Sequence, residues 1–327
     1  MMPFALRIGS RPSALALAQA NLLKRRLEAS LDGLRAEIIP ISTSGDRMAT
    51  ASLARVGGKG LFIRELEQAL AAGRIDIAVH SMKDLPAILS PQFRIAAVPE
   101  RENPFDALIT RRGGGWNDLA PGARLGTSST RRRLEAARIR PDLDIVPLRG
   151  NVDTRLRRLE AGDFDGIILA IAGLRRLGRA DNLAMTQLDD RVFVPAGGQG
   201  ALALEALTDR IIGGSAELER VVADLDDIRS AAEVAAERSF LAAIGASCAS
   251  PVGVRGSAVD NSLRLNALLF SLDGGRSMAD EISAPCRTDV APDAAARRET
   301  IERAASIGTE LGRRMLARGA AELIASG

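Results

Sequence analysis

Residues 76–84, DIAVHSMKD, decide the fold class. The first part of this stretch is apolar at consecutive positions, which is typical of a strand buried on both faces of a parallel sheet. Polar residues follow where such a strand ends. Because a parallel strand needs a long crossover connection, usually a helix, we expect an α/β fold around residues 76–80.

The segments around this strand alternate in the same way between short apolar runs and amphipathic patterns. The expected strands are residues 5–10, 36–41, 76–80, 106–110, 124–126, 144–148 and 165–170, and the expected helices are 13–30, 60–72, 129–138 and 152–160. Two such blocks in series predict two doubly wound domains with a ligand crevice between them.

The pattern changes after about residue 215. A helical stretch toward residue 244 comes first, followed by strands at 252–255, 263–269 and 278–283 and a helix at 292–318, which together predict a smaller α+β domain. Segments 99–104 and 194–200 are rich in Pro and Gly and predict two crossings between the first two domains. The expected domain 1 is residues 1–99 with 200–218, domain 2 is 100–199, and domain 3 is 219–327.

Composition narrows the class of protein. The 327 residues are 46% hydrophobic and 26% charged, as in soluble globular proteins. No apolar run approaches the roughly 18 residues that span a bilayer. The first ten residues lack the charged flank and cleavage site of a signal peptide, so we expect a cytoplasmic protein and nothing demands more than a monomer.

Metal and nucleic-acid sites have little support. One histidine and two distant cysteines, Cys248 and Cys286, cannot supply clustered zinc ligands, and a disulfide is not expected in the cytoplasm. The net charge is only +3, aromatic residues make up 3%, and tyrosine is absent, so base-stacking surfaces would be sparse. We expect no metal and no nucleic-acid partner.

Arginines gather at the junctions between predicted strands and helices, where open parallel sheets bind ligands. Helix N-termini at such junctions also attract anions. The residues concerned are Arg11, Arg131, Arg132, Arg133, Arg149, Arg155, Arg175 and Arg176, with hydroxyls at Thr127, Ser128 and Ser129. Any one of these arginines could be a solvated surface residue. The set predicts a ligand with several carboxylates or phosphates, because arginine pairs with both.

Two further features allow both a functional and a structural interpretation. Asp84, at the end of the strand at 76–80, could hold N–H donors or a developing cation, or could cap the following turn. Cys248 lies in a loop of small residues after a long helix, where its sulfur could react or simply pack. His80 fits a hydrogen-bonded core histidine, and Cys286 fits inert packing.

Together these segments resemble the hydroxymethylbilane synthase (porphobilinogen deaminase) family from about Leu6 to the C-terminus. The order and spacing of the strings make the resemblance specific. The strings are RIGSRPS (7–13), VGGKGLF (56–62), HSMKDLP (80–86), GTSS (126–129) with Arg131 and Arg132, LRGN (148–151) with Arg155, ILA (168–170) with GL (173–174), PA (195–196) with GQG (198–200), and Glu237 and Arg238 before Cys248.

The resemblance implies a three-domain fold whose first two domains are like periplasmic anion-binding proteins. It also implies an enzyme that condenses four porphobilinogen molecules head to tail, with loss of ammonia, and then releases linear hydroxymethylbilane by hydrolysis. The family builds this product on a dipyrromethane cofactor joined by a thioether to a cysteine, which maps to Cys248. Asp84 maps to the catalytic residue that contacts pyrrole N–H groups and assists loss of ammonia.

The remaining roles are carried over residue by residue. The implied cofactor-binding residues are Lys83, Asp84, Ser129, Arg131, Arg132 and Arg155. The implied substrate-binding residues are Arg11, Ser13, Thr127, Ser128, Arg149, Arg155 and Arg176. Lys59 maps to the family's lid over the site. The cysteine loop departs from the family pattern at Ala246 and Ser250, and Ser44 replaces a common arginine. A binding protein of the same fold is the main alternative, but that interpretation gives Asp84 and Cys248 no functional role.

Overall fold

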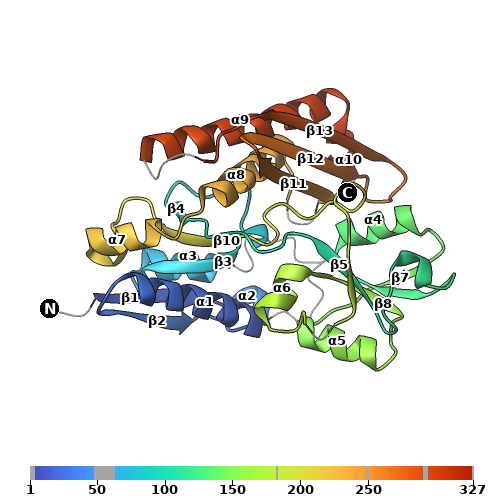
Figure 1. Cartoon of the computed structure of the whole chain (residues 1–327), viewed down its shortest axis with the longest axis horizontal. Coiled ribbons are helices and arrows are strands. Elements are labelled where there is room, and N and C mark those ends of the chain that lie inside the picture. Colours follow the sequence, from blue (N-terminus) through green and yellow to red (C-terminus); the bar gives the residue numbers. More distant parts are fainter. Residues whose placement is uncertain (1–3, 48–62, 182, 248–249, 290–293, 326–327) are drawn as a thin grey trace. The chain divides into compact units, whose positions relative to one another are not determined.

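Three sheets organise the chain in the computed structural model, which describes residues 4–47, 63–181, 183–247, 250–289 and 294–325 (Figure 1). The chain divides into two compact units. The first contains Met1–Arg101 and Ala201–Ala231, and the second contains Glu102–Gly200 and Ala232–Gly327. The chain therefore leaves the first unit after residue 101, returns to it at residue 201 and leaves it again after residue 231.

The first unit is built on a mixed sheet in the order β2-β1-β3-β10-β4. Strands β1, β2 and β3 are parallel, whereas β10 runs antiparallel to both β3 and β4. The strands are β1 (Phe4–Ser10), β2 (Leu34–Pro40), β3 (Ile77–Ser81), β4 (Phe93–Ala97) and β10 (Leu202–Leu207), and the helices are α1 (Ala14–Ser30), α2 (Ser44–Arg47), α3 (Arg64–Ala71) and α7 (Ala216–Ala223).

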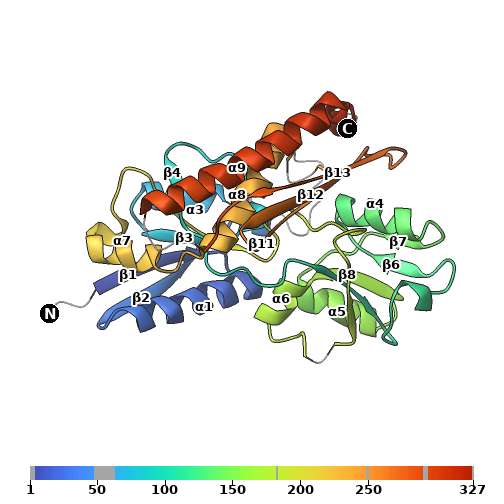
Figure 2. The ribbon, with the colours of Figure 1, turned by 45° about the horizontal axis from the view of Figure 1, so that its top comes forward.

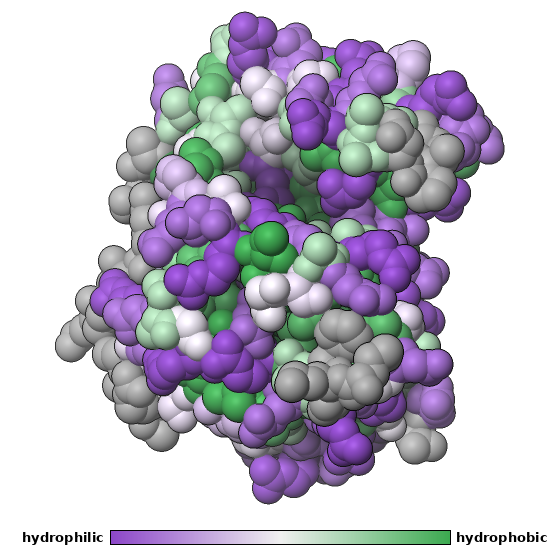
Figure 3. Space-filling view, turned by 90° about the vertical axis from the view of Figure 1, so that its left-hand side faces the viewer, coloured by the Kyte–Doolittle hydropathy of each residue, from purple (hydrophilic) through white to green (hydrophobic). Residues whose placement is uncertain are grey.

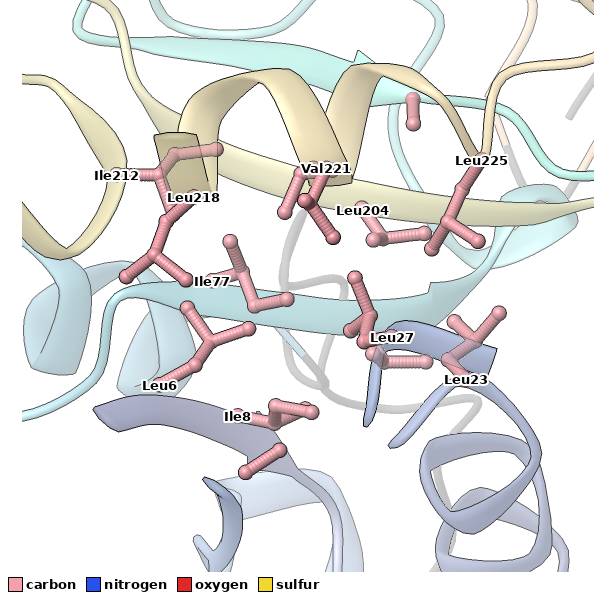
Figure 4. Close-up of a cluster of buried hydrophobic side chains, with 14 of the residues drawn as sticks. Leu6, Ile8, Leu23, Leu27, Ile77, Leu204, Ile212, Leu218, Val221 and Leu225 are labelled. Atoms are coloured by element: carbon pink, nitrogen blue, oxygen red, sulfur yellow. The ribbon is translucent and has the colours of Figure 1, made fainter. Parts of the chain in front are cut away.

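Helices cover both faces of this sheet, because successive residues of its buried strands point to opposite sides. On one face, Leu6 and Ile8 of β1 pack with Leu23 of α1 and Val221 of α7 (Figure 4). On the other face, the cluster contains Ala78 of β3 and Leu66, Ala69 and Leu70 of α3. The first unit therefore has the doubly wound architecture that the sequence predicts.

The second unit repeats this arrangement in a sheet of order β7-β6-β8-β5-β9. Strands β6, β7 and β8 are parallel, and β5 runs antiparallel to β8 and β9. Separate apolar clusters line the two faces of the sheet. The strands are β5 (Asp106–Thr110), β6 (Arg124–Gly126), β7 (Asp144–Val146), β8 (Gly166–Ala170) and β9 (Met185–Gln187), and the helices are α4 (Thr130–Ile139), α5 (Val152–Glu160) and α6 (Ile171–Arg176).

The second unit also contains an antiparallel sheet in the order β11-β12-β13. Helices α8, α9 and α10 pack on one face of it (Figure 2). On the other face, Leu268 and Phe270 of β12 pack against Leu134 of α4. The elements are α8 (Ile228–Ala243), β11 (Val252–Val259), β12 (Ser262–Phe270), β13 (Ser277–Pro285), α9 (Ala294–Ala317) and α10 (Ala320–Ala325).

The predicted fold class, two doubly wound domains and a smaller α+β domain, is confirmed. Several details differ from the predictions. Strands β4, β9 and β10 were not expected, β7 ends two residues earlier, and the helical stretch after residue 215 is two helices. The helix expected at 60–72 begins at Arg64 in the described part of the chain. The exact domain boundaries and the crevice between the first two domains stay predictions.

The surface is mostly hydrophilic on the face shown in Figure 3, where hydrophobic residues form separate patches. Large hydrophobic side chains that are exposed in the described residues are few and distant in sequence. They are Leu22, Ile88, Val192, Ile211 and Val259. Scattered apolar residues of this kind are ordinary on a protein surface. No helix in the described ranges is long and apolar enough to cross a membrane.

Candidate anion-binding site

The predicted site residues of the second unit meet at one edge of its mixed sheet. Strands β6, β7 and β8 are parallel neighbours, so their carboxyl ends lie at the same edge. Each of these ends leads into a helix. The residues that follow the three strands are Thr127, Ser128, Ser129, Arg131 and Arg132 after β6, Arg149 and Arg155 after β7, and Arg176 after β8. The three junctions of the second unit therefore lie along one edge of the sheet, although Arg176 is six residues beyond β8, at the end of α6.

Hydroxyl groups shape the junction between β6 and α4. The Ser129 side chain is the N-cap of α4 and accepts a hydrogen bond from the Arg132 N–H at 3.4 Å. The Thr127 hydroxyl accepts from the Ser129 N–H at 3.2 Å, and the Ser128 hydroxyl donates to the Leu148 carbonyl at 2.8 Å. These bonds hold the loop in place at a helix N-terminus, which favours anions.

Arg155 lies in the first turn of α5 with little to neutralise its charge. Its Nε donates to the Gly150 carbonyl at 2.8 Å, and no carboxylate in the described ranges forms an ion pair with it. Burial, together with the nearby Arg132 cation, lowers the pKa of Arg155 to about 10. Arg149 is exposed and forms no hydrogen bond or ion pair among the described residues. This junction offers two guanidinium groups to an anion.

Arg176, at the end of α6, also has a guanidinium group whose hydrogen-bond donors are not all satisfied. Its Nη2 donates to the Gly200 carbonyl at 2.5 Å, while its buried Nε has no hydrogen-bond partner. Burial lowers the pKa of Arg176 to about 10, although Glu102 opposes the effect. A buried donor without an acceptor is unfavourable unless a ligand or water supplies one. The edge therefore fits a ligand with anionic groups.

Arg131 and Arg132 differ from Arg155, because a buried carboxylate already binds them. Asp106, the first residue of β5, accepts from Arg131 Nη2 at 2.7 Å and from Arg132 Nη2 at 2.6 Å. Glu135 accepts from Arg131 Nη1 at 2.7 Å, and Gln199 donates to Asp106 at 2.9 Å. None of these three partners is predicted from the sequence. Only the four-residue spacing between Arg131 and Glu135 was a usable signal.

The second set of predicted residues lies in the first unit. Arg11 and Ser13 follow β1, and Lys83 and Asp84 follow β3, which is parallel to β1. Ser13 caps α1 by accepting from the Ala16 N–H at 3.3 Å. Arg11 forms an ion pair with Asp46 at 2.5 Å, a partner that the sequence analysis did not identify. Burial opposes ionisation of Asp46, but hydrogen bonds from Arg11 and Thr43 outweigh it and lower the pKa.

Asp84 ends a short 3₁₀ turn (Met82–Asp84) that follows β3 directly. Met82 and Leu85 on either side are buried and fix the turn, whereas Asp84 is half-buried. Its carboxylate forms no hydrogen bond or ion pair among the described residues. His80 is buried and lies 2.9 Å from Glu205, which confirms the prediction of a hydrogen-bonded core histidine. The turn thus presents one carboxylate without a partner at the end of a buried strand.

The two cysteines are not equivalent. Cys248 lies outside the described residues, as does Lys59. Ser247 and Ser250, which flank residues 248–249, are joined by hydrogen bonds from the Ser247 N–H to the Ser250 hydroxyl and from the Ser250 N–H to the Ser247 carbonyl, both at 3.0 Å. Cys286 is buried in the core beside α9, and burial raises the pKa of its thiol. The prediction that Cys286 is inert packing is confirmed.

The fold and these strand ends define an α/β protein that presents several guanidinium groups and helix N-termini at one sheet edge. No group of three or more metal-ligating side chains occurs among the described residues. The family model "Porphobilinogen deaminase, dipyromethane cofactor binding domain" matches residues 6–211, and the model of the C-terminal domain of the same enzyme matches residues 231–317. The chain belongs to the porphobilinogen deaminase family, whose members are transferases.

Relatives with this name are similar along most of their length. The porphobilinogen deaminase of Syntrophotalea carbinolica is 42% identical over 326 residues, covering 100% of this chain and 97% of the relative. That of Syntrophobacter fumaroxidans is 46% identical over 269 residues, covering 82% of this chain and 85% of the relative. The match therefore extends over all the elements described above.

Solved structures of solute-binding proteins are more distantly similar. The probable amino-acid transporter binding protein ytmK of Bacillus subtilis is 12% identical with a TM-score of 0.41, covering 68% of this chain and 90% of that one. A TRAP periplasmic solute binding protein of Desulfovibrio salexigens is 13% identical, also with a TM-score of 0.41, covering 68% and 72%.

Proposed function

We propose that this chain joins four porphobilinogen molecules head to tail, with loss of ammonia, and releases linear hydroxymethylbilane by hydrolysis. The observation that carries this proposal is the pair of half-buried guanidinium groups, Arg155 and Arg176, which lie on the helices after the parallel strands β7 and β8 and form no ion pair among the described residues. Porphobilinogen and its oligomers carry an acetate and a propionate on every ring. A site with unneutralised guanidinium groups suits such a polycarboxylate.

The residues proposed to hold the dipyrromethane cofactor fit a group that has both carboxylates and N–H donors. Their members are Lys83, Asp84, Ser129, Arg131, Arg132 and Arg155. When bound, the cofactor supplies the free pyrrole position to which the first substrate ring is joined. Arg155 supports the fit, because its guanidinium is desolvated and has no carboxylate partner in the described ranges. Asp84 supports it as an unpaired acceptor for pyrrole N–H groups.

Cys248 is the proposed attachment point of the cofactor. The only other cysteine, Cys286, is buried in an apolar core, and its raised pKa disfavours the thiolate that would react. Ser247 and Ser250 support the proposal, because the hydrogen bonds between them hold the described residues on either side of Cys248 close together. Serine at position 250 therefore has a role in the loop despite departing from the family pattern.

The incoming substrate would bind through its two carboxylates to a second group of residues. They are Arg11, Ser13, Thr127, Ser128, Arg149, Arg155 and Arg176. Each hydrogen bond to a charged group contributes about 1.5–3 kcal/mol, so three or four of them hold a small ligand firmly. Arg149 supports this role, since it is exposed at a strand end and unpaired in the described part of the chain.

Asp84 is the proposed catalytic residue. As ammonia leaves porphobilinogen, the ring nitrogen supplies the electron pair and a cation develops on the substrate. The Asp84 carboxylate would accept a hydrogen bond from the pyrrole N–H and stabilise this charge electrostatically. Its placement supports the role: the short turn after β3 holds it between buried Met82 and Leu85, so the carboxylate needs little reorganisation.

Three further features of the working enzyme belong to this proposal. Lys59 would lie in a lid over the site, on the basis of its sequence motif. The protein would act as a monomer, which the scattered exposed hydrophobic residues support. It would act in the cytoplasm, without a metal, nucleic-acid or membrane partner, as the sequence analysis expects.

Intact-protein mass spectrometry tests the proposal directly. Protein produced in a host that makes porphobilinogen should carry a two-pyrrole adduct. The adduct should be absent from Cys248→Ala and present in Cys286→Ala, the matched control. Wild-type protein without an adduct and without turnover, but with retained affinity for porphobilinogen, would instead support a binding protein of the same fold.

A further inference from the structure

We propose that Asp106 is a positioning residue of this enzyme, which orients the guanidinium groups of Arg131 and Arg132 toward the cofactor. This inference rests on the proposed function and deepens it. Asp106 begins β5 and is fully buried, so water cannot compensate for its charge. Its two oxygens bind two different arginines, both of which belong to the proposed cofactor set.

The geometry leaves little freedom to either arginine. Asp106 Oδ2 accepts from Arg131 Nη2 at 2.7 Å, while Oδ1 accepts from Arg132 Nη2 at 2.6 Å and from Arg132 Nε at 3.1 Å. Arg132 Nη1 donates to the carbonyl of Ile168, in the middle of β8, at 3.1 Å. The planar fork of Arg132 is therefore fixed on two sides, and its orientation follows from the position of one carboxylate.

Two further side chains hold the carboxylate and its partners. Gln199 Nε2 donates to Asp106 Oδ1 at 2.9 Å and to the Pro104 carbonyl at 2.8 Å. Arg131 Nη1 bridges Glu135 at 2.7 Å and the Val194 carbonyl at 2.8 Å. These hydrogen bonds connect β5, α4 and the segment at residues 194–200 around the Asp106 carboxylate.

Charge balance explains why such a network suits an anion site. Asp106 faces both Arg131 and Arg132, whereas burial raises the pKa of Glu135 to about 8, so at neutral pH one ionised carboxylate opposes two guanidinium groups inside the cluster. Arg155 adds a third cation that no described carboxylate pairs with, and the charge of Arg132 reaches it, as the lowered pKa of Arg155 shows. The arginines are fixed in place while positive charge remains at the strand ends, where a carboxylate ligand would bind.

The variant Asp106→Glu tests positioning, because it retains the charge and moves the carboxylate by one methylene group. Misplacement of catalytic groups by about 1 Å can reduce rates by up to roughly 100-fold. We expect kcat to fall at least 10-fold, with the KM for porphobilinogen changed less than 3-fold. We also expect a lower fraction of protein carrying the two-pyrrole adduct, which intact mass measures independently of activity.

Glu233→Asp is the matched control. Glu233 is a buried carboxylate of α8 in the same unit, and it accepts from the Ala258 N–H at 3.0 Å and from Arg255 at 3.4 Å. Glu233→Asp should retain kcat and adduct at the wild-type level.

If Asp106→Glu does not fold, Gln199→Met replaces it as the test. This change removes a hydrogen bond to Asp106 and leaves both of its ion pairs, so kcat should fall about 3-fold.

The outcomes separate the two proposals. The positioning role would be overturned if a folded Asp106→Glu variant kept wild-type kcat and the wild-type level of adduct. The same result in Gln199→Met would overturn it where that variant replaces Asp106→Glu. The enzyme proposal would stand in both cases. A wild-type protein that carries no adduct would overturn the enzyme proposal itself. A fall in kcat that Glu233→Asp shows equally would also count against Asp106, because it would reflect loss of packing rather than of orientation.

Discussion

Replacing Arg155 by glutamine should stabilise the cofactor-free protein while it weakens ligand binding. Folding removes this cation from water without supplying a counter-ion, and burial lowers its pKa to about 10. One pKa unit corresponds to about 1.4 kcal/mol, so this lowering from the ordinary pKa of arginine amounts to a penalty of roughly 3 kcal/mol before solvent is considered. Because the side chain is partly exposed, solvent screening reduces this to about 1–2 kcal/mol.

Differential scanning calorimetry in a Cys248→Ala background, which prevents cofactor attachment, measures the effect. For a unit of about 200 residues the expected rise in Tm is roughly 2–8 °C at pH 7. The penalty is complete below pH 10 and fades above it, because the folded protein then releases the proton, so the rise should shrink in strongly alkaline buffer.

Arg157→Gln is the matched control for this prediction, since Arg157 is an exposed residue of the same helix that donates a hydrogen bond to the Thr154 hydroxyl. It should change Tm by less than about 1 °C, as surface substitutions usually do. An unchanged or lower Tm for Arg155→Gln would refute the argument that Arg155 is a desolvated and uncompensated cation.

Three other predictions concern the reaction. Asp84→Asn should keep the two-pyrrole adduct but lower kcat by roughly 100- to 1,000-fold, the usual effect of removing one electrostatic stabiliser, and near-normal turnover would remove Asp84 from the mechanism. Arg149→Leu should raise the KM for porphobilinogen about 10-fold or more with the adduct still attached, so unchanged kinetics would exclude Arg149 from substrate binding. Porphobilinogen affinity in Cys248→Ala, measured by calorimetric titration, should fall as pH rises through about 10, because Arg155 and Arg176 lose their protons there; constant affinity to pH 11 would contradict this.

The sequence predicted the parallel strands of both mixed sheets because short apolar runs alternate with amphipathic helical patterns along the chain. It did not reveal β10, although residues 202–207 are all buried. Such a run fits a buried strand of either direction, and its antiparallel pairing with β3 and β4 depends on where the chain returns after residue 200. Strands β4 and β9 are short edge strands with weak patterns. Tertiary pairing, rather than local preference, defines these three elements.

For the site, the sequence could indicate that the junctions carrying Arg131, Arg132, Arg149 and Arg155 share one sheet edge, because the carboxyl ends of neighbouring parallel strands lie at the same edge. It could not show which arginines are already neutralised. Asp106 lies 25 residues before Arg131, and only the antiparallel placement of β5 beside β8 brings the two together. The same limit applies to Arg11 and Asp46, which are 35 residues apart. Sequence spacing identifies the cations, whereas their partners depend on the fold.

The position of β10 has a consequence for synthesis of the chain on the ribosome. Residues 1–101 contain four strands of the first sheet, yet β4 pairs only with β10 among the described strands, and one edge of β3 stays open without it. At about 5–20 residues per second, the ribosome needs roughly 5–20 s to make the hundred residues between β4 and the end of β10. During that interval the nascent chain exposes an unpaired strand edge, which makes it a natural client for a chaperone.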